Sequence, residues 1–148
     1  TVVHSSEYIS QLMKAGKIKP LKSMNETVTY HDPCHLTRSL SLQFETPQDA
    51  LYEQPREVLR AIPGLKMVEM RTHKGGSRCC GAGGGVKSGF PQLAVQIGKS
   101  RINEAELTKA STIISTCPFC ENNLSDAIKE MNSHLKVADL IEILDKVL

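Results

Sequence analysis

The chain contains the stretch Ser111-Thr112-Ile113-Ile114-Ser115-Thr116-Cys117-Pro118-Phe119-Cys120. Its first six residues are β-branched or small, which is the composition of a short strand. A Cys-x-x-Cys pair follows without a gap, and a helical pattern then runs to Met131. The stretch therefore predicts a strand that ends at two thiols, which are followed by a helix.

The same alternation of strand and helix patterns extends over the rest of the chain. We expect strands at residues 27–30, 65–70, 111–116 and 135–138, and helices at residues 5–15, from Thr46-Pro47, from Pro55 to before Pro63, at 91–108, after Cys120 and from Asp139. Residues 75–89 hold seven glycines and show neither a helical nor a strand period. The pattern predicts an α/β fold, a small and mostly parallel sheet flanked by helices.

All five cysteines follow predicted strands. Cys34 comes after the first strand, Cys79 and Cys80 after the second, and Cys117 and Cys120 after the third. The carboxyl ends of strands in an open parallel sheet share one edge, where binding crevices form. We therefore expect three distant segments to bring their thiols to one metal site at this edge.

The composition is that of a single domain in a reducing compartment. The length of 148 residues suits one domain, and the first residue, Thr1, predicts that residues 1–148 are a fragment of a longer chain. A net charge of +2 and 4% aromatic residues argue against nucleic acid as a partner. An odd number of cysteines, five, argues against a disulfide framework and favours a cytoplasmic location.

Three kinds of thiol chemistry compete for these cysteines. A structural zinc module would use four of them, but adjacent side chains in an extended segment point apart, so Cys79 and Cys80 suit one tetrahedron poorly. A redox dithiol would use only Cys117 and Cys120, at a helix N-terminus that lowers thiol pKa values. An iron–sulfur cluster has several irons, so adjacent cysteines can bind different ones. The glycines around the doublet would let the backbone approach such a cluster.

The arrangement Cys34, Cys79-Cys80-Gly81 and Cys117-x-x-Cys120 resembles the cysteine-rich CCG domain of heterodisulfide reductase catalytic subunits, most closely the C-terminal part of the D type. The flanking segments at residues 28–36, 53–59 and 80–85 share the resemblance, which covers about residues 5–148. It implies that Cys34, Cys79, Cys80, Cys117 and Cys120 bind a non-cubane [4Fe-4S] cluster, with Gly81 beside it. It also implies cleavage of the coenzyme M–coenzyme B disulfide in one-electron steps.

The resemblance further implies partners. Many relatives carry two such motifs and a ferredoxin-like domain, whereas this chain has one motif. We expect a second CCG domain and a ferredoxin-like domain in the same or another chain, an electron-donating subunit such as a membrane cytochrome, and a thiol or disulfide substrate. The location would then be cytoplasmic or at the cytoplasmic face of a membrane complex. Iron–sulfur subunits of lactate and glycolate oxidation share the domain, so electron transfer in such a complex is an alternative.

Residues other than cysteine are also candidates. His31 and His35 flank Cys34 and could donate protons to a substrate thiolate, or they could simply shape the loop. Lys74, Arg78 and Lys87 bracket the glycine-rich segment as possible anion-binding groups or solvated charges, and Phe119 is expected to pack between its neighbouring cysteines. The 44 residues between Cys34 and Cys79 exceed our expectation for the family, and the extra segment falls near residues 39–50.

Overall fold

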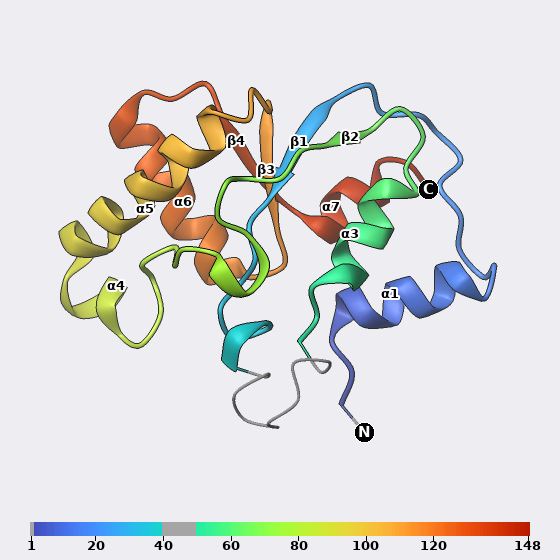
Figure 1. Ribbon diagram of the computed structural model, residues 1–148, viewed down its shortest axis with the longest axis horizontal. Helices are drawn as coiled ribbons and strands as arrows, with labels where there is room; N and C mark the ends of the chain where they lie inside the picture. Colours follow the sequence, from blue (N-terminus) through green and yellow to red (C-terminus); the bar gives the residue numbers. More distant parts are fainter. Residues whose placement is uncertain (1, 40–49) are drawn as a thin grey trace.

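A four-stranded parallel sheet forms the centre of the molecule in the computed structural model, which describes residues 2–39 and 50–148 (Figure 1). Its strands are β1 (Thr27–Tyr30), β2 (Lys66–Met67), β3 (Thr112–Ser115) and β4 (Lys136–Asp139). They lie in the order β2-β1-β3-β4, and each neighbouring pair is parallel. This confirms the α/β fold with a small parallel sheet.

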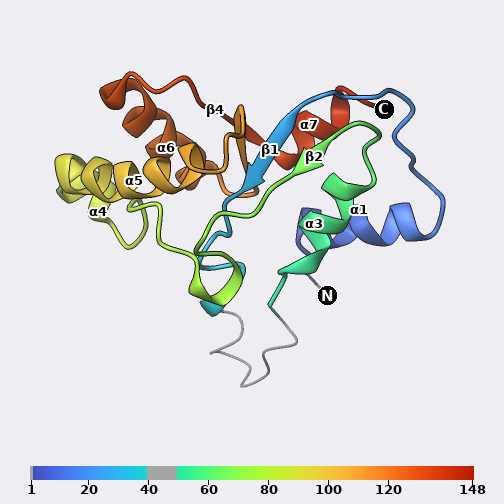
Figure 2. The same ribbon diagram turned by 45° about the horizontal axis from the view of Figure 1, so that its top comes forward.

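Helices cover both faces of the sheet. They are α1 (Ser5–Lys14), α3 (Glu53–Arg60), α4 (Val86–Gly89), α5 (Pro91–Glu106), α6 (Pro118–Met131) and α7 (Leu140–Asp145), with a 3-10 turn, η2, at Lys74–Gly76. Figures 1 and 2 show α1, α3 and α7 on one side of the sheet and α4, α5 and α6 on the other. The sheet is therefore the middle of three layers.

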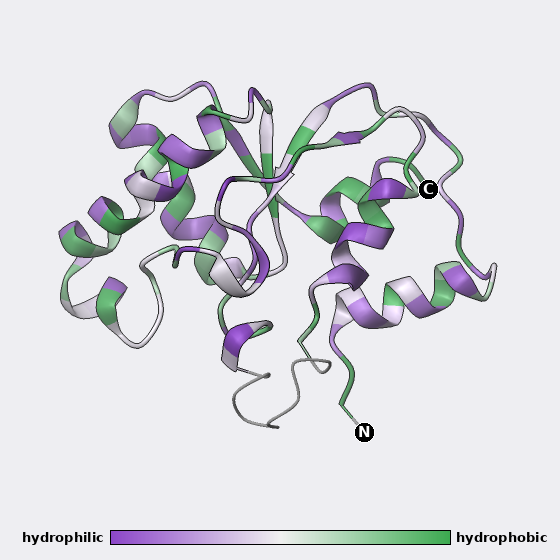
Figure 3. Ribbon diagram, viewed as in Figure 1, coloured by the Kyte–Doolittle hydropathy of each residue, from purple (hydrophilic) through white to green (hydrophobic). Residues whose placement is uncertain are grey.

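A hydrophobic core lies on each face of the sheet, and successive side chains of β3 point alternately into the two cores. Ile114 packs with Val28, Tyr30 and the residues of α3 and α7, whereas Ile113 packs with residues of α5 and α6. Both isoleucines are fully buried, and each contributes about 1.5–3 kcal/mol by its removal from water. In Figure 3, hydrophobic and hydrophilic residues alternate along α1, α5 and α6, as expected of helices with one buried face.

Local signals place the ends of several helices. Asp139 and Glu142 form a capping box at the start of α7. Pro118 occupies the first turn of α6, directly after Cys117 as N-cap, and Asn132 ends that helix in the left-handed conformation. Helix α7 begins at Asp139 as the sequence predicted, whereas α6 begins at Pro118 and so already includes Cys120, which the sequence placed before the helix.

Some predictions differ from the structure. Strand β2 has two residues rather than six, because only Lys66 and Met67 have register partners in β1, namely Thr27 and Val28. The glycine-rich segment, predicted to have no regular structure, contains part of η2 and the short helix α4. These elements have three and four residues, which is too short for a periodic sequence pattern. The helix predicted from Thr46 falls outside the described residues.

In the part of the chain that the structure describes, no helix combines the length and the apolar character needed to span a bilayer.

Candidate metal centre

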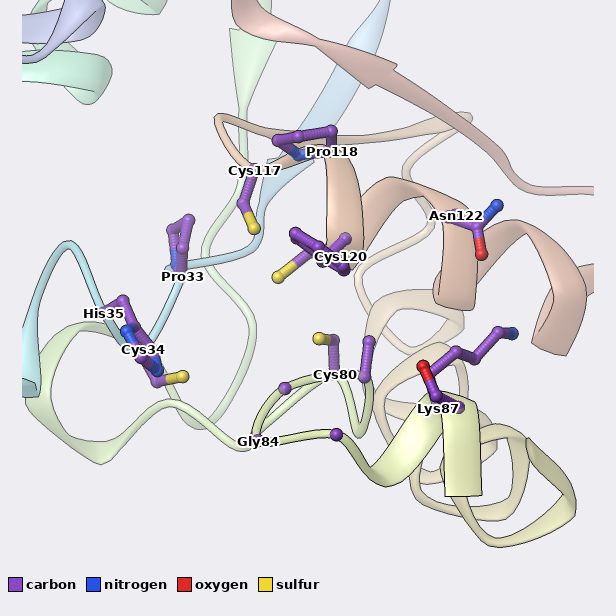
Figure 4. A pocket seen from close by; sticks show the side chains of 15 residues that line it. Pro33, Cys34, His35, Cys80, Gly84, Lys87, Cys117, Pro118, Cys120 and Asn122 are labelled. Carbon is purple, nitrogen blue, oxygen red and sulfur yellow. The ribbon is translucent and has the colours of Figure 1, made fainter. Parts of the chain in front are cut away.

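The cysteines meet past the carboxyl ends of the strands, as predicted. Cys34 follows β1, the doublet follows β2, and Cys117 follows β3. A pocket of about 680 Å³ lies between these segments, and its walls include Cys34, Cys80, Cys117 and Cys120. Figure 4 shows the sulfur atoms of these four residues directed toward a common space.

Burial divides the thiols into two groups. Cys80 and Cys120 are 3% and 4% exposed and form the floor of the pocket. Cys34, Cys79 and Cys117 are only partly buried and lie nearer the solvent. All five are free thiols. The site therefore combines an enclosed floor with a rim that a substrate or partner can reach.

A buried ion pair holds the loop that carries Cys34. Arg56 of α3 donates two hydrogen bonds to the carboxylate of Asp32, at 2.7 and 2.9 Å, and two more to Glu69. Asp32 also accepts the backbone N–H of Lys74 at 2.8 Å. The guanidinium lies 5.0 Å from the ring centre of Tyr30. These contacts join the loops after β1 and β2, which deliver separate cysteines.

The doublet is held by close packing and by Asn123. Gly81 has a φ of +95°, and a Cβ atom there would lie 2.5 Å from the carbonyl oxygen of Ala94 in α5. Only glycine suits this position. The buried amide of Asn123 donates to the carbonyl oxygens of Cys80 and Ala94, at 2.6 and 2.8 Å. Residues of α5 and α6 thus set the path of the doublet.

Hydrogen bonds among the thiols distribute negative charge unevenly. The pKa of Cys80 is lowered chiefly because its sulfur accepts hydrogen bonds from the thiols of Cys120 and Cys79. The pKa values of Cys79 and Cys120 are raised, since their thiols act as donors to the neighbouring sulfurs. Cys117 also accepts from Cys120 and, at the N-terminus of α6, from backbone N–H groups, and these contacts lower its pKa to about 6. Cys80 and Cys117 therefore favour the thiolate, the form that binds metals, whereas Cys79 and Cys120 favour the thiol.

His31 and His35 occupy different environments. His35 is exposed and lines the pocket. His31 is 1% exposed, and its Nδ1 lies 3.0 Å from Nε of Arg101 in α5. Its Nε2 is buried without a hydrogen-bond partner among the described residues. One ring nitrogen and the sulfurs of Cys80 and Cys120 all lie within 4.8 Å of one another.

The three cations that were candidates for binding an anionic substrate each pair with a carboxylate of the protein. Lys74 pairs with Glu53, Arg78 with Glu104, and Lys87 with Asp126. Lys87 lines the pocket, but its ammonium group also donates to Asn123. The prediction for Phe119 was wrong: its ring is 67% exposed at the pocket rim rather than packed between the cysteines, because it lies on the outer side of the first turn of α6.

Sequence patterns did not single out Arg56, Arg101 or Asn123 as parts of the site. Both arginines are fully buried, and Asn123 is too. For Arg101 a signal was present, since this cation falls on the side of α5 that carries the apolar residues Ala94 and Ala105. A charged group on a buried helix face needs a buried partner.

Comparison with known proteins places the chain in a family. Residues 28–125 match the family described as cysteine-rich domain, CCG, and the chain belongs to it. The match spans the segments that carry all five cysteines.

Several curated relatives are named as oxidoreductases or as subunits of them. The chain is 46% identical over 147 residues to the D-type subunit of dihydromethanophenazine:CoB–CoM heterodisulfide reductase from Methanosarcina barkeri, covering 99% of this chain and 34% of that protein. It is 38% identical to the B-type subunit of fumarate reductase (CoM/CoB) from Methanothermobacter marburgensis, covering 97% of this chain and 27% of the relative. It is 36% identical to the probable iron–sulfur-binding oxidoreductase FadF of Bacillus subtilis, covering 97% and 19%. The chain thus spans about a third or less of these proteins' lengths.

Proposed function

We propose that this domain binds a non-cubane [4Fe-4S] cluster through Cys34, Cys79, Cys80, Cys117 and Cys120 and works in a larger oxidoreductase. The reaction would be reduction of a disulfide of the coenzyme M–coenzyme B type, or electron transfer in a related complex. A second cysteine-rich domain, a ferredoxin-like domain and an electron-donating subunit would complete it. The names of the relatives, which include a component of a heterodisulfide reductase and an iron–sulfur-binding oxidoreductase, support this proposal.

The observation that carries the proposal is the convergence of the thiols on one pocket. Four cysteine side chains line it, and Cys79 lies beside it with its sulfur accepting the N–H of Gly81 at 3.3 Å. A single tetrahedral ion would leave one thiol unused. A cluster offers separate irons to the two members of the doublet. The buried Nε2 of His31, which has no hydrogen-bond partner in the described part of the chain, also suits a centre rich in sulfur acceptors.

A disulfide becomes two thiols when it takes up two electrons and two protons. When bound, the cluster would supply the electrons in single steps and an iron for a substrate sulfur. The cluster and a substrate sulfur would share the pocket of about 680 Å³, whose lining includes Cys34 and Cys117. His35, exposed on the pocket wall, is the group from which a released thiolate could receive a proton.

A zinc module is the second candidate, and one observation favours it. His31, Cys80 and Cys120 present three ligand atoms within 4.8 Å of one another. A fourth thiol, such as Cys117, could complete a tetrahedral site of the structural kind. The domain would then serve as an interaction module without catalysis.

Anaerobic reconstitution with iron and sulfide separates the two candidates. The measurements are metal and acid-labile sulfide content, followed by EPR of the oxidised protein with and without coenzyme M or coenzyme B thiol. We expect about four irons per chain and a paramagnetic signal that broadens when one of the thiols is added. Cys80→Ser should lose iron, whereas Ser88→Ala, which alters another pocket residue, should retain it.

Each outcome decides between the proposals. Stoichiometric zinc with no iron retained under anaerobic conditions would overturn the cluster and leave the structural module. Full iron loading with a signal that neither thiol changes would overturn disulfide reduction at this cluster and leave electron transfer.

A further inference from the structure

The contact between Arg101 and His31 joins segments that are 70 residues apart in the sequence. Arg101 lies on α5 and is fully buried, and its Nε approaches Nδ1 of His31 at 3.0 Å. Its Nη1 donates to the carbonyl oxygen of Thr72 at 2.7 Å and to the carboxylate of Glu104 at 2.6 Å. These three partners hold the guanidinium in one orientation.

The direction of this hydrogen bond follows from chemistry alone. A guanidinium has five N–H donors and no acceptor, so in the contact with Arg101 the imidazole Nδ1 must be the acceptor. The ring proton of a neutral His31 is then on Nε2. The sulfurs of Cys80 and Cys120 are the neighbours left for this N–H, since Nε2 has no nitrogen or oxygen partner among the described residues.

We propose that Arg101 is a positioning residue that keeps the proton of His31 on Nε2, so that His31 donates a hydrogen bond to the sulfur at the floor of the pocket. His31 is then a donor to the metal centre and not one of its ligands. An Nε2 that carries a proton has no lone pair for zinc, and removal of this proton would create an anionic imidazolate in a buried site. N–H donors to cluster sulfur stabilise the more reduced, more negative state and raise the reduction potential.

The functional half of this inference rests on the proposed iron–sulfur cluster, whereas the position of the proton does not. The first experiment therefore uses the wild-type, metal-free protein. Two-dimensional ¹⁵N–¹H correlation of the histidine side chains reports which ring nitrogen carries the proton, and the His31→Gln variant assigns the signal of His31 among the five histidines. We expect a neutral ring with the proton on Nε2. A proton on Nδ1 would overturn the proposal.

The second experiment is a double-mutant cycle on the reduction potential of the reconstituted protein. We expect His31→Leu and Arg101→Met each to shift the potential to a more negative value. If Arg101 acts through His31, Arg101→Met should cause little further shift in the His31→Leu background, because the donor is already absent. A shift of Arg101→Met that is the same with and without His31 would show a direct effect of the charge and overturn the positioning role.

Arg56→Met is the matched control. Arg56 is also fully buried and also pairs with carboxylates, Asp32 and Glu69, but it makes no hydrogen bond to His31. Its replacement should reduce stability without moving the proton of His31.

If the protein takes up zinc instead of iron while His31 keeps its Nε2 proton, the proposed function fails and the tautomer assignment stands. Loss of that proton on zinc binding would make His31 a ligand and overturn the inference.

Discussion

Arg56 and Asp32 are joined by two parallel hydrogen bonds, of 2.7 and 2.9 Å, and the side chains of both residues are fully buried. The pair connects α3 to the loop that leads from β1 to Cys34. A bidentate contact of this kind fixes the relative orientation of the guanidinium and the carboxylate as well as the distance between them. The position of Cys34 is therefore set by a helix that lies elsewhere in the sequence.

Removal of Arg56 should strongly destabilise the fold. Arg56→Met leaves the Asp32 carboxylate buried without its partner, and breaking a buried pair in this way costs about 3–5 kcal/mol. The free energy of unfolding in urea measures the loss. Arg60→Met is the control, because Arg60 is exposed and its pairing with Glu53 is worth about 0–1 kcal/mol. Equal losses in the two variants would contradict the role of the buried pair.

The conformation of Gly81 should be essential to the site. Gly81→Ala introduces a methyl group that meets the carbonyl oxygen of Ala94 and also imposes a left-handed backbone on a residue with a Cβ atom. Backbone strain of this kind costs about 1–3 kcal/mol, and displacement of the doublet should reduce metal uptake as well. Thermal unfolding and metal content give the two readouts. Gly83→Ala should change neither, because the space around that position is open.

Asn123 should be needed to place the doublet. Asn123→Ala removes the donors to the carbonyl oxygens of Cys80 and Ala94, and unsatisfied buried groups of this kind cost about 1–3 kcal/mol. We expect lower stability and weaker retention of metal against a chelator. The neighbouring Asn122→Ala is the comparison, because Asn122 is exposed. Chelator resistance that is unchanged in Asn123→Ala would argue against this placement.

The pairing of α1 with α3 should depend on pH. Hydrogen bonds from Lys14 and Ser10 lower the pKa of Glu57, so the folded state releases this proton more readily than the unfolded state. The resulting stability is present above the ordinary carboxyl pKa and is lost as the pH falls through the lowered folded-state value. The wild type should therefore exceed Glu57→Gln in stability at pH 7, and the difference should shrink toward pH 3. If the stability difference between the wild type and Glu57→Gln grew on acidification, the lowered pKa of Glu57 in the folded state would be contradicted.

The elements of the fold followed largely from short-range patterns. The β-branched residues of β1 and β3, and the helical spacing in α5 and α6, reflect periodicities that a segment shows without its neighbours. The length of β2 could not be predicted in this way, because an edge strand ends where its one partner stops pairing. The exposure of Phe119 likewise depends on which face of α6 the sheet covers.

The sequence by itself determined the strand–cysteine–helix order, and with it the meeting of five thiols at one edge of a parallel sheet. Only the tertiary structure decided which groups surround them. Arg101 contacts His31, which is 70 residues away in the sequence. Arg56 contacts Asp32, which is 24 residues away. A buried charge takes whichever polar group the packed layers bring to it, and no local spacing encodes that meeting.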